Sequence, residues 1–284
     1  MSYLNVSDTH LGLFDPESVE KKGPELSAQY NAAKPFPHIV IDDFLSPEIL
    51  DLCLKEFPKQ LDKEGMNFDR PQERLKSSFN PDYIHPHLRS FFYSLNSKPL
   101  IKFLENMTGI KGLIPDPWFL GAGFHEIKNG GHLSMHADFN HHKPMNLERR
   151  INVLIYLNKD WKEEYGGQLE LWDNAMTKCE VSVVPLFNRC VVFNTTSNSN
   201  HGNPNPVNHP KEQPRRSIAL YYYTSTWSDE KREHTTQFRT RPGANDQTDY
   251  KIKREEMIKD LLPPMMYRSI RKITGKIKKG EKTD

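Results

Sequence analysis

Apolar and β-branched residues gather in short stretches through the middle of the chain. Residues 150–157 form a strongly β-prone run, and residues 168–172 alternate polar and apolar positions after Gly166 and Gly167. Further runs of this kind are residues 132–139, 181–185, 190–193 and 217–224. Several short strands separated by turns are typical of a β-sandwich or barrel, so the pattern predicts a mainly β core.

The stretch before this core predicts helices and one strand that pack on it. Residues 35–41 predict an opening strand, and Ser46 is a good helix N-cap because proline and an acidic residue follow it. Residues 88–107 predict a pair of helices that ends at Gly109. The fold class expected from the pattern is therefore mainly β with flanking α-helices.

Composition narrows the class of protein only slightly. The chain has 284 residues and a net charge of +2, with a mean hydropathy of −0.74, which fits one large domain and implies no strong polyanion partner. No apolar stretch approaches a membrane span, and the first residues lack the regions of a signal peptide. The three cysteines, Cys53, Cys179 and Cys190, have no metal-binding spacing. We therefore expect free thiols and a cytoplasmic location.

Candidate chemistry lies in the pattern His-x-Asp followed much later by a second histidine. Alternate side chains of a strand share a face, so His136 and Asp138 can reach one metal while Ala137 points away. His201, from another strand, would complete the set. Two imidazoles and one carboxylate suit mononuclear non-haem Fe(II) and leave positions open for a bidentate 2-oxo acid and O2. The pattern predicts a metal site at His136, Asp138 and His201.

With these residues in view, residues 119–224 resemble the catalytic domain of the 2-oxoglutarate/Fe(II)-dependent dioxygenases, in their prolyl 4-hydroxylase-like branch. Residues 156–161 are similar to the hypoxia-factor-type prolyl hydroxylases and residues 166–171 to the ribosomal-protein type. The matching pieces, in family order, are residues 136–138, 155–161, 166–171, 191–193, 201–202 and 215–217. The resemblance implies a double-stranded β-helix, which is a jelly roll of two facing antiparallel sheets with iron at its open end.

The resemblance also implies how the cofactors are held. Fe(II) would bind the triad, and 2-oxoglutarate would place its distal carboxylate on Arg215 and Tyr156. Ser217 shares the parity of Arg215 on a strand and would add a hydroxyl. L-Ascorbate would serve as a reductant. Together with the sequence pattern of the flanks, this predicts four segments. Residues 1–33 are an N-terminal segment that is expected to be flexible, and residues 34–115 are a support region of helices and strand. Residues 116–228 are the dioxygenase core, and residues 229–284 are a charged extension with a basic tail.

Two assignments have alternatives. Arg216 neighbours Arg215, and only one of them can point inwards on a strand. We choose Arg215 because of the Arg-x-Ser pattern, and Arg216 is then expected at the solvated surface. His209 is a second candidate for the distal histidine, but it sits in a loop and is expected at the surface, whereas His201 follows an apolar strand.

The expected reaction is hydroxylation of an unactivated C–H, with decarboxylation of 2-oxoglutarate to succinate and CO2. The resemblance makes a prolyl residue of a protein the first candidate substrate. A small metabolite, such as an amino acid, a sugar-linked or a natural-product intermediate, is the alternative. A non-catalytic metal- or carbohydrate-binding jelly roll is a third hypothesis, although such a module needs no Arg215 and no Tyr156.

The surroundings of the site give weaker predictions. Asn140 and His141 directly follow the metal-binding pair and are candidate substrate contacts. Arg149 and Arg150 are expected at an exposed strand end, and His125 and Glu126 are candidates for supporting the metal ligands. The Asn- and Pro-rich residues 195–214 are expected at the mouth of the barrel, where substrate is selected. The basic residues of 268–284 predict a solvated terminus, the one signal for nucleic acid or a membrane surface.

Overall fold

A computed structural model of the chain describes residues 2–8, 12–228 and 230–261. It divides into two compact units, residues 1–246 and residues 247–284. The second unit contains the helix α5, Tyr250–Leu261, and the predicted basic tail lies outside the described residues. None of the described helices combines the length and the apolar character needed to cross a bilayer.

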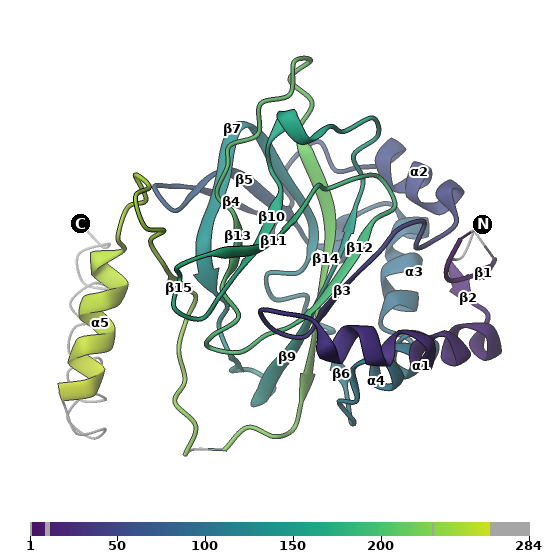
Figure 1. Ribbon diagram of the computed structural model, residues 1–284. Helices are drawn as coiled ribbons and strands as arrows, with labels where there is room; N and C mark the ends of the chain where they lie inside the picture. Colours follow the sequence, from purple (N-terminus) through teal and green to yellow (C-terminus); the bar gives the residue numbers. More distant parts are fainter. Residues whose placement is uncertain (1, 9–11, 229, 262–284) are drawn as a thin grey trace, which may run out of the picture. The chain divides into compact units, whose positions relative to one another are not determined.

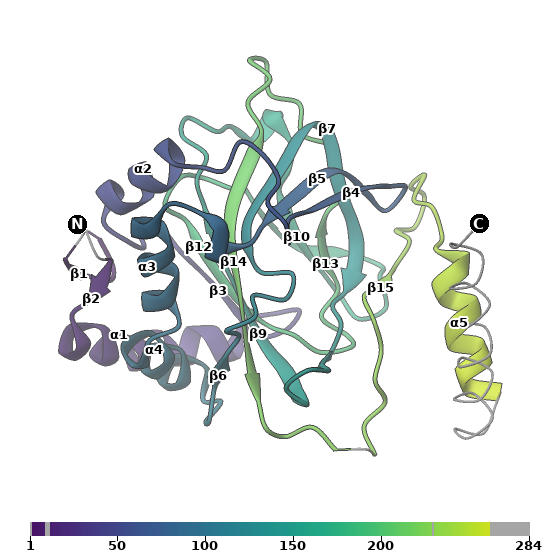
Figure 2. The same ribbon diagram turned by 180° about the vertical axis from the view of Figure 1, so that it is seen from behind.

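The first unit is a nearly closed antiparallel barrel flanked by four α-helices (Figures 1 and 2), which confirms the predicted jelly roll. The helices are α1 (Pro16–Ala32), α2 (Pro47–Lys55), α3 (Pro86–Leu95) and α4 (Lys98–Thr108), with 3-10 turns at Pro81–Tyr83 and Glu163–Tyr165. The strands are β1 (Val6–Asp8), β2 (Leu13–Phe14), β3 (His38–Ile41), β4 (Met66–Arg70), β5 (Glu73–Phe79), β6 (Ile114–Pro115), β7 (Gly123–Ala137), β8 (His141–His142), β9 (Leu147–Tyr156), β10 (Leu169–Trp172), β11 (Cys179–Val183), β12 (Cys190–Asn194), β13 (His201–Asn203), β14 (Arg215–Thr224) and β15 (Gln237–Phe238).

The long strand β7 belongs to both sheets of the barrel. Its first half pairs with β14 over residues 123–127, and its second half pairs with β13 over residues 133–136. Between the halves, the pairing with β5 shifts register around Asn129, Gly130 and Gly131. The hydrogen-bonded strands are continuous through β7, and we call the two halves on either side of it the two sheets of the barrel. One half contains β3, β4, β5, β6, β8, β9, β12 and β14, and the other contains β10, β11, β13 and β15.

Strand parity separates the helix-facing side of the barrel from its interior. Ile151, Val153 and Ile155 of β9 lie in the main core cluster with the apolar residues of α1–α4. The alternate residue Tyr156 lies in a second, inner cluster that includes Leu171 and other residues of β10–β12. Burial of this continuous apolar face against the helices supplies most of the driving force for the arrangement.

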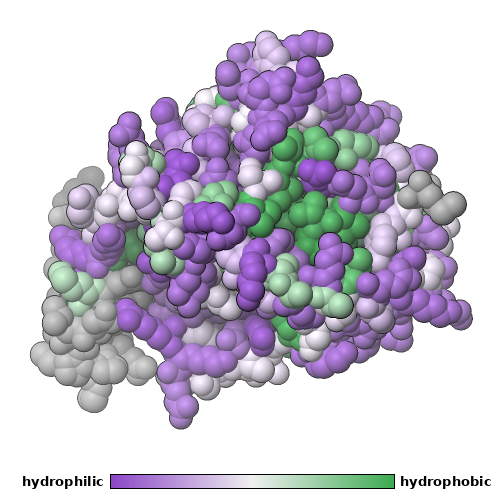
Figure 3. Space-filling model, viewed as in Figure 1, coloured by the Kyte–Doolittle hydropathy of each residue, from purple (hydrophilic) through white to green (hydrophobic). Residues whose placement is uncertain are grey.

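The end strands of the sheet path, β11 and β3, are not paired with each other within the described part of the chain. Half-buried Phe36, Val40 and Val181 pack against the inner cluster at this opening. Figure 3 shows the resulting apolar surface as the green area over β3 and β12. Side-chain packing, and not backbone hydrogen bonding, therefore fills the opening between β11 and β3.

Most predicted elements are present, including the helix after Ser46 and the left-handed Gly109 that ends α4. The pattern did not indicate α1, whose apolar positions are sparse and which contains Pro24. Nor did it indicate the hairpin of β4 and β5, which is mostly polar. The division of the chain into four segments stays a prediction.

Candidate active site

The fold brings the predicted triad together at one end of the barrel. His136 lies at the end of β7, and His201 at the start of β13 is its direct cross-strand partner. The ligand atoms of His136, Asp138 and His201 all lie within 4.8 Å of one another. Asp138 Oδ1 is 3.5 Å from His136 Nε2, and Asp138 Oδ2 is 3.3 Å from His201 Nε2. Among the described residues, no other cluster of this kind has metal-binding geometry.

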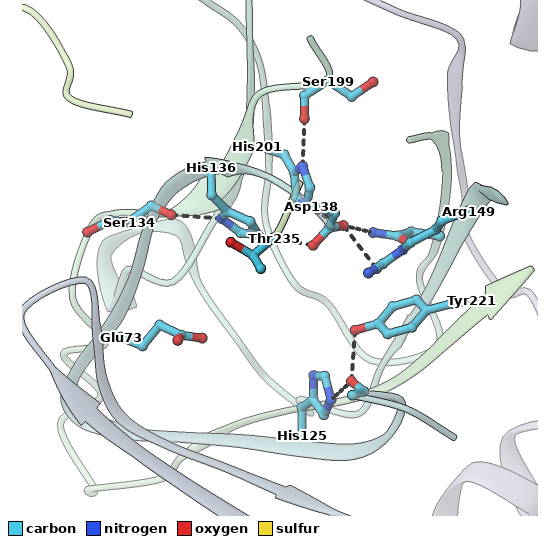
Figure 4. Close-up of polar contacts among 12 residues, drawn as sticks. Glu73, His125, Ser134, His136, Asp138, Arg149, Ser199, His201, Tyr221 and Thr235 are labelled. Atoms are coloured by element: carbon cyan, nitrogen blue, oxygen red, sulfur yellow. Dashed lines mark hydrogen bonds and ion pairs between the residues drawn. The ribbon is translucent and has the colours of Figure 1, made fainter. Parts of the chain in front are cut away.

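Each histidine is oriented by a backbone carbonyl (Figure 4). The Nδ1 of His136 lies 2.9 Å from the Ser134 carbonyl, and the Nδ1 of His201 lies 2.8 Å from the Ser199 carbonyl. Because a carbonyl only accepts, Nδ1 carries the proton and Nε2 presents a lone pair to the centre of the triad. Burial, reinforced by neighbouring His136, lowers the pKa of His201, which keeps this ring neutral.

Asp138 is held by a buried arginine that the sequence interpretation placed wrongly. Arg149 was expected at an exposed strand end, but its side chain is only 1 % exposed and its Nη2 lies 2.9 Å from Asp138 Oδ2. Asn152 donates to the same oxygen at 2.7 Å and accepts from Arg149. Burial alone would raise the pKa of Asp138, but the charge of Arg149 outweighs it and holds the pKa well below its usual range.

A bulge explains why this arginine faces inwards. The pairing of β9 with β14 shifts between Tyr222 and Tyr223, so that Tyr222 opposes Ile151 and Tyr223 opposes Arg149. The shift turns Arg149 inwards, to the face of Asn152. There its guanidinium lies 3.6 Å from the ring centre of Tyr221 and 4.4 Å from that of Phe139.

A small interior cavity extends from the triad to Arg215, and Ser217 also lines it. Arg215 is 5 % exposed, donates from Nε to the Gly167 carbonyl at 2.7 Å, and donates from Nη2 to the Tyr156 phenol at 3.3 Å. Tyr156 opposes Ser217 across the strands β9 and β14. Burial lowers the pKa of Arg215, and within the described part of the chain no carboxylate pairs with it. A buried cation without a counter-ion is costly, so this cavity suits an anionic ligand.

The two alternative residues lie elsewhere. Arg216 faces the other side of its strand, where it pairs with Glu126 at 2.9 Å and covers the ring of Phe57. His209 is not at the surface as expected: it is 6 % exposed and packs against Trp161 and Tyr165. A histidine that stacks on two aromatic rings has a packing role, and it is not part of the triad cluster.

The position of Arg215 depends on Gly167. This glycine has φ +70, and a Cβ there would lie 2.9 Å from Arg215 Cδ. Because Arg215 is the predicted partner of 2-oxoglutarate, we expect Gly167→Ala to displace the guanidinium and weaken 2-oxoglutarate binding by at least about tenfold, with a loss of stability of about 1 kcal/mol from the left-handed backbone. Calorimetric titration and thermal unfolding of the variant measure the two effects. Gly243→Ala is the matched control, because it shares the left-handed φ and no atom lies within 4 Å of its Cβ. Equal 2-oxoglutarate affinities in the two variants would contradict the expectation.

A second, larger cavity of about 580 Å³ opens from the triad towards solvent. Its walls include residues of the β4–β5 hairpin and residues 233–236, together with Leu120, Gly121, Phe139, His141, Lys143 and Pro144. The expected mouth, residues 195–214, contributes none of its described lining, and the buried Val207 and His209 show that this loop packs inwards instead. The prediction that this loop forms the mouth was therefore wrong.

The weaker site candidates are divided between the cavities. His141 lines the large cavity and stacks on Trp227 with a centroid distance of 4.0 Å. Asn140 does not line it, and instead bonds to the backbone of Arg232 and His234. His125 lines both cavities, and burial, with the nearby charge of Lys76, lowers its pKa to about 3.

Two charged residues of β5 were missed by the sequence interpretation. Lys76 lines both cavities, and Glu73 lines the large one. Glu73 pairs with Lys76 at 3.1 Å and with Arg70, and these cations outweigh burial and lower its pKa. A shift of register beside Leu75, which has φ 50, turns both residues inwards. Figure 4 shows Glu73 facing the same space as the triad.

Comparison with known proteins agrees with this geometry. Residues 122–223 match the family model of the 2OG-Fe(II) oxygenase superfamily. A prolyl hydroxylase from Trichoplax adhaerens, in complex with a hypoxia inducible factor peptide fragment, has the same fold, with a TM-score of 0.52 and 20 % identity over 73 % of this chain and 91 % of that chain. A Pseudomonas putida prolyl-4-hydroxylase has a TM-score of 0.48 and 17 % identity, covering 71 % and 100 % of the two chains. HygX from Streptomyces hygroscopicus, with nickel and 2-oxoglutarate bound, has a TM-score of 0.49 and 11 % identity, covering 73 % and 89 %.

The matched stretch contains the whole triad, so the chain contains a domain that matches the 2OG-Fe(II) oxygenase superfamily at residues 122–223. It is a 2-oxoglutarate-dependent dioxygenase, prolyl 4-hydroxylase-like in its fold, and its cofactors are Fe(II) and 2-oxoglutarate. The predicted resemblance, the enzyme class and the cofactors Fe(II) and 2-oxoglutarate are confirmed.

Proposed function

We propose that His136, Asp138 and His201 bind the iron and that Arg215, Tyr156 and Ser217 bind 2-oxoglutarate. The observation that carries this proposal is Arg215, a buried cation with no acidic partner in the described part of the chain, at the far end of a cavity that begins at the triad. The donor set of the triad, two imidazole nitrogens and a carboxylate oxygen, suits Fe(II). When bound, iron and 2-oxoglutarate supply oxidative hydroxylation of a C–H, with release of succinate and CO2.

The protein contributes orientation and exclusion of water. Ser134 and Ser199 fix the two imidazole rings, and Arg149 with Asn152 fixes the carboxylate of Asp138. The small cavity is lined largely by buried residues, so a cosubstrate at Arg215 is held away from bulk solvent. No side chain needs to act as a general acid or base for this reaction.

We propose a prolyl residue of a protein as the substrate group. The large cavity is wider than one side chain requires, and its rim carries the exposed apolar side chains of Met66 and Leu120, which suit a peptide extending past the cavity. His141 lines this cavity, which supports its role as a substrate contact. Asn140 does not line it, and its hydrogen bonds to the backbone of Arg232 and His234 position the segment that does. A small metabolite is the second candidate, because a volume of about 580 Å³ also fits a ligand of that size.

Asp138→Ala is expected to lose iron binding and with it all succinate formation. The substitution removes the one anionic ligand of the triad and leaves Arg149 as a buried charge without its partner. Succinate is measured with the Fe(II)-loaded protein and 2-oxoglutarate, and metal content is measured after desalting. Asp173→Ala is the control for a carboxylate outside the site. Succinate production by the Asp138 variant would overturn the assignment of the ligands.

A second assay distinguishes a protein substrate from a small-metabolite substrate. Incubation with proline-containing peptides and with a panel of amino acids and amino-sugar compounds, followed by mass spectrometry, detects the addition of one oxygen atom. An oxidised peptide supports the protein substrate, and an oxidised metabolite with unchanged peptides overturns it. A cytoplasmic location and a dependence on ascorbate stay predictions; the three free cysteines suit a reducing compartment.

A further inference from the structure

Asn203 occupies an inward-facing position beside the metal ligands. It lies two residues after His201 on β13 and opposes Leu133 of β7, so it shares the face of His201. Its side chain is 3 % exposed and lines the small cavity together with Arg215 and Ser217. Neither the triad nor the predicted 2-oxoglutarate contacts include it.

The side-chain amide of Asn203 contains an unpaired hydrogen-bond donor. Its Nδ2 is buried and has no hydrogen-bond partner within the described part of the chain. Four other buried side-chain atoms share this state, but they belong to residues that do not line the small cavity: His141, Thr195, Asn200 and Tyr223. Folded proteins pair nearly all buried polar groups, because an unpaired donor loses its bonds to water and gains none. The free donor therefore points to a ligand that accepts a hydrogen bond.

The surroundings specify what kind of ligand this is. The walls next to Asn203 are apolar, with Leu133, Leu169 and Ile127 lining the same cavity. The charged group there that lacks an acidic partner is the Arg215 guanidinium. A carboxylate that enters such a space loses its water shell and needs several donors at once. Asn203 is placed to be one of them.

The two sheets would then share the ligand. Arg215 and Ser217 belong to β14, in the sheet that also contains β9, whereas Asn203 belongs to β13, in the sheet that also contains β10. A ligand bonded to both strands is held from opposite walls of the barrel, which limits its rotation more than contacts from one strand do.

We propose that Asn203 binds the 2-oxo acid cosubstrate by donating its Nδ2–H to a carboxylate oxygen. This inference rests on the proposed function, and it adds a cosubstrate ligand on the sheet opposite Arg215. The residue is neither a metal ligand nor a proton donor in the reaction. Its contribution is affinity and orientation, so the variant has a clear signature that does not require turnover.

Asn203→Leu tests this role by replacing the amide with an apolar side chain of similar length. The dissociation constant of 2-oxoglutarate is measured by calorimetry on the Fe(II)-loaded protein without oxygen, and unfolding is measured on the metal-free protein. We expect 2-oxoglutarate to bind about tenfold or more weakly, because a hydrogen bond to a charged group is lost. The metal-free variant should unfold at the same or a higher temperature, because a buried unpaired donor is removed.

The controls separate this role from a structural one. Asn198→Leu changes an exposed asparagine of the same loop region that lines neither cavity, and should leave the 2-oxoglutarate affinity unchanged. Retention of iron by Asn203→Leu shows that the triad is intact. An affinity within about twofold of the wild type, or a loss of affinity that accompanies a lower unfolding temperature, overturns the inference. Failure of the wild-type protein to bind 2-oxoglutarate at all overturns the proposed function first, and this inference with it.

Discussion

Arg215→Met is expected to weaken 2-oxoglutarate binding by at least about a hundredfold, because truncation of one partner in a buried pair of charges costs about 3 kcal/mol or more. Arg215 is the cation of the small cavity without an acidic partner in the described part of the chain, so the variant leaves the cosubstrate carboxylate without a counter-ion. The stability of the protein without cosubstrate should not fall. The variant replaces a buried, unpaired guanidinium with an apolar side chain, so the free energy of unfolding should stay the same or rise. Calorimetry and denaturation of the metal-free protein measure the two quantities.

The adjacent arginine provides the matched control. Arg216→Met removes a partly buried pair with Glu126 and a contact with the ring of Phe57, so we expect a stability loss of about 1–3 kcal/mol and no change in 2-oxoglutarate affinity. If both variants lose affinity equally, the carboxylate is not bound by Arg215 alone. If only Arg216→Met loses 2-oxoglutarate affinity, then Arg216 and not Arg215 faces the small cavity.

Arg149→Met should destabilise the metal-free protein by about 3–5 kcal/mol, because it breaks a buried ion pair and leaves Asp138 as an under-compensated buried carboxylate. The substitution also removes the stacking of the guanidinium on Tyr221. Arg149→Lys keeps the charge but loses the planar contacts with Asn152, so it should recover only part of the stability. Urea denaturation of the metal-free proteins gives the free energies of unfolding.

The control for this prediction is again the next residue in the chain. Arg150 is half-buried and donates to Thr224 Oγ1 at 3.3 Å, so Arg150→Met should cost about 1 kcal/mol or less. Equal losses in the two variants would show that the contact of Arg149 with Asp138 does not stabilise the fold.

The residues that the sequence predicted are those whose positions follow from local alternation. His136 and Asp138 share a face of one strand end, and Arg215 shares the parity of Ser217, so regular strands bring each pair together. The strands β9, β10, β12 and β14 are apolar enough to be recognised without tertiary information. The overall fold and the triad depend on little else.

The residues that the sequence missed depend on irregularities. Arg149 faces inwards because of the bulge beside Tyr223, and Lys76 faces inwards because of the shift beside Leu75. A shift of the strand register by one residue exchanges the buried and the exposed side chains, and the local sequence contains no signal of such a shift. His209 illustrates a different limit, since its burial comes from Trp161 and Tyr165, which are distant in the chain. Only the folded structure places such contacts.

The walls of the large cavity come mainly from outside the stretch that the superfamily shares. The β4–β5 hairpin precedes residue 122 and residues 233–236 follow residue 223, whereas the triad, Arg215 and Asn203 all lie between these limits. Selection can therefore reshape the hairpin and the downstream segment for a new substrate without altering the residues proposed to hold the iron and the cosubstrate. The same separation makes the hairpin an exchangeable cassette, through which an engineer could redirect this oxygenase while leaving its oxidising machinery in place.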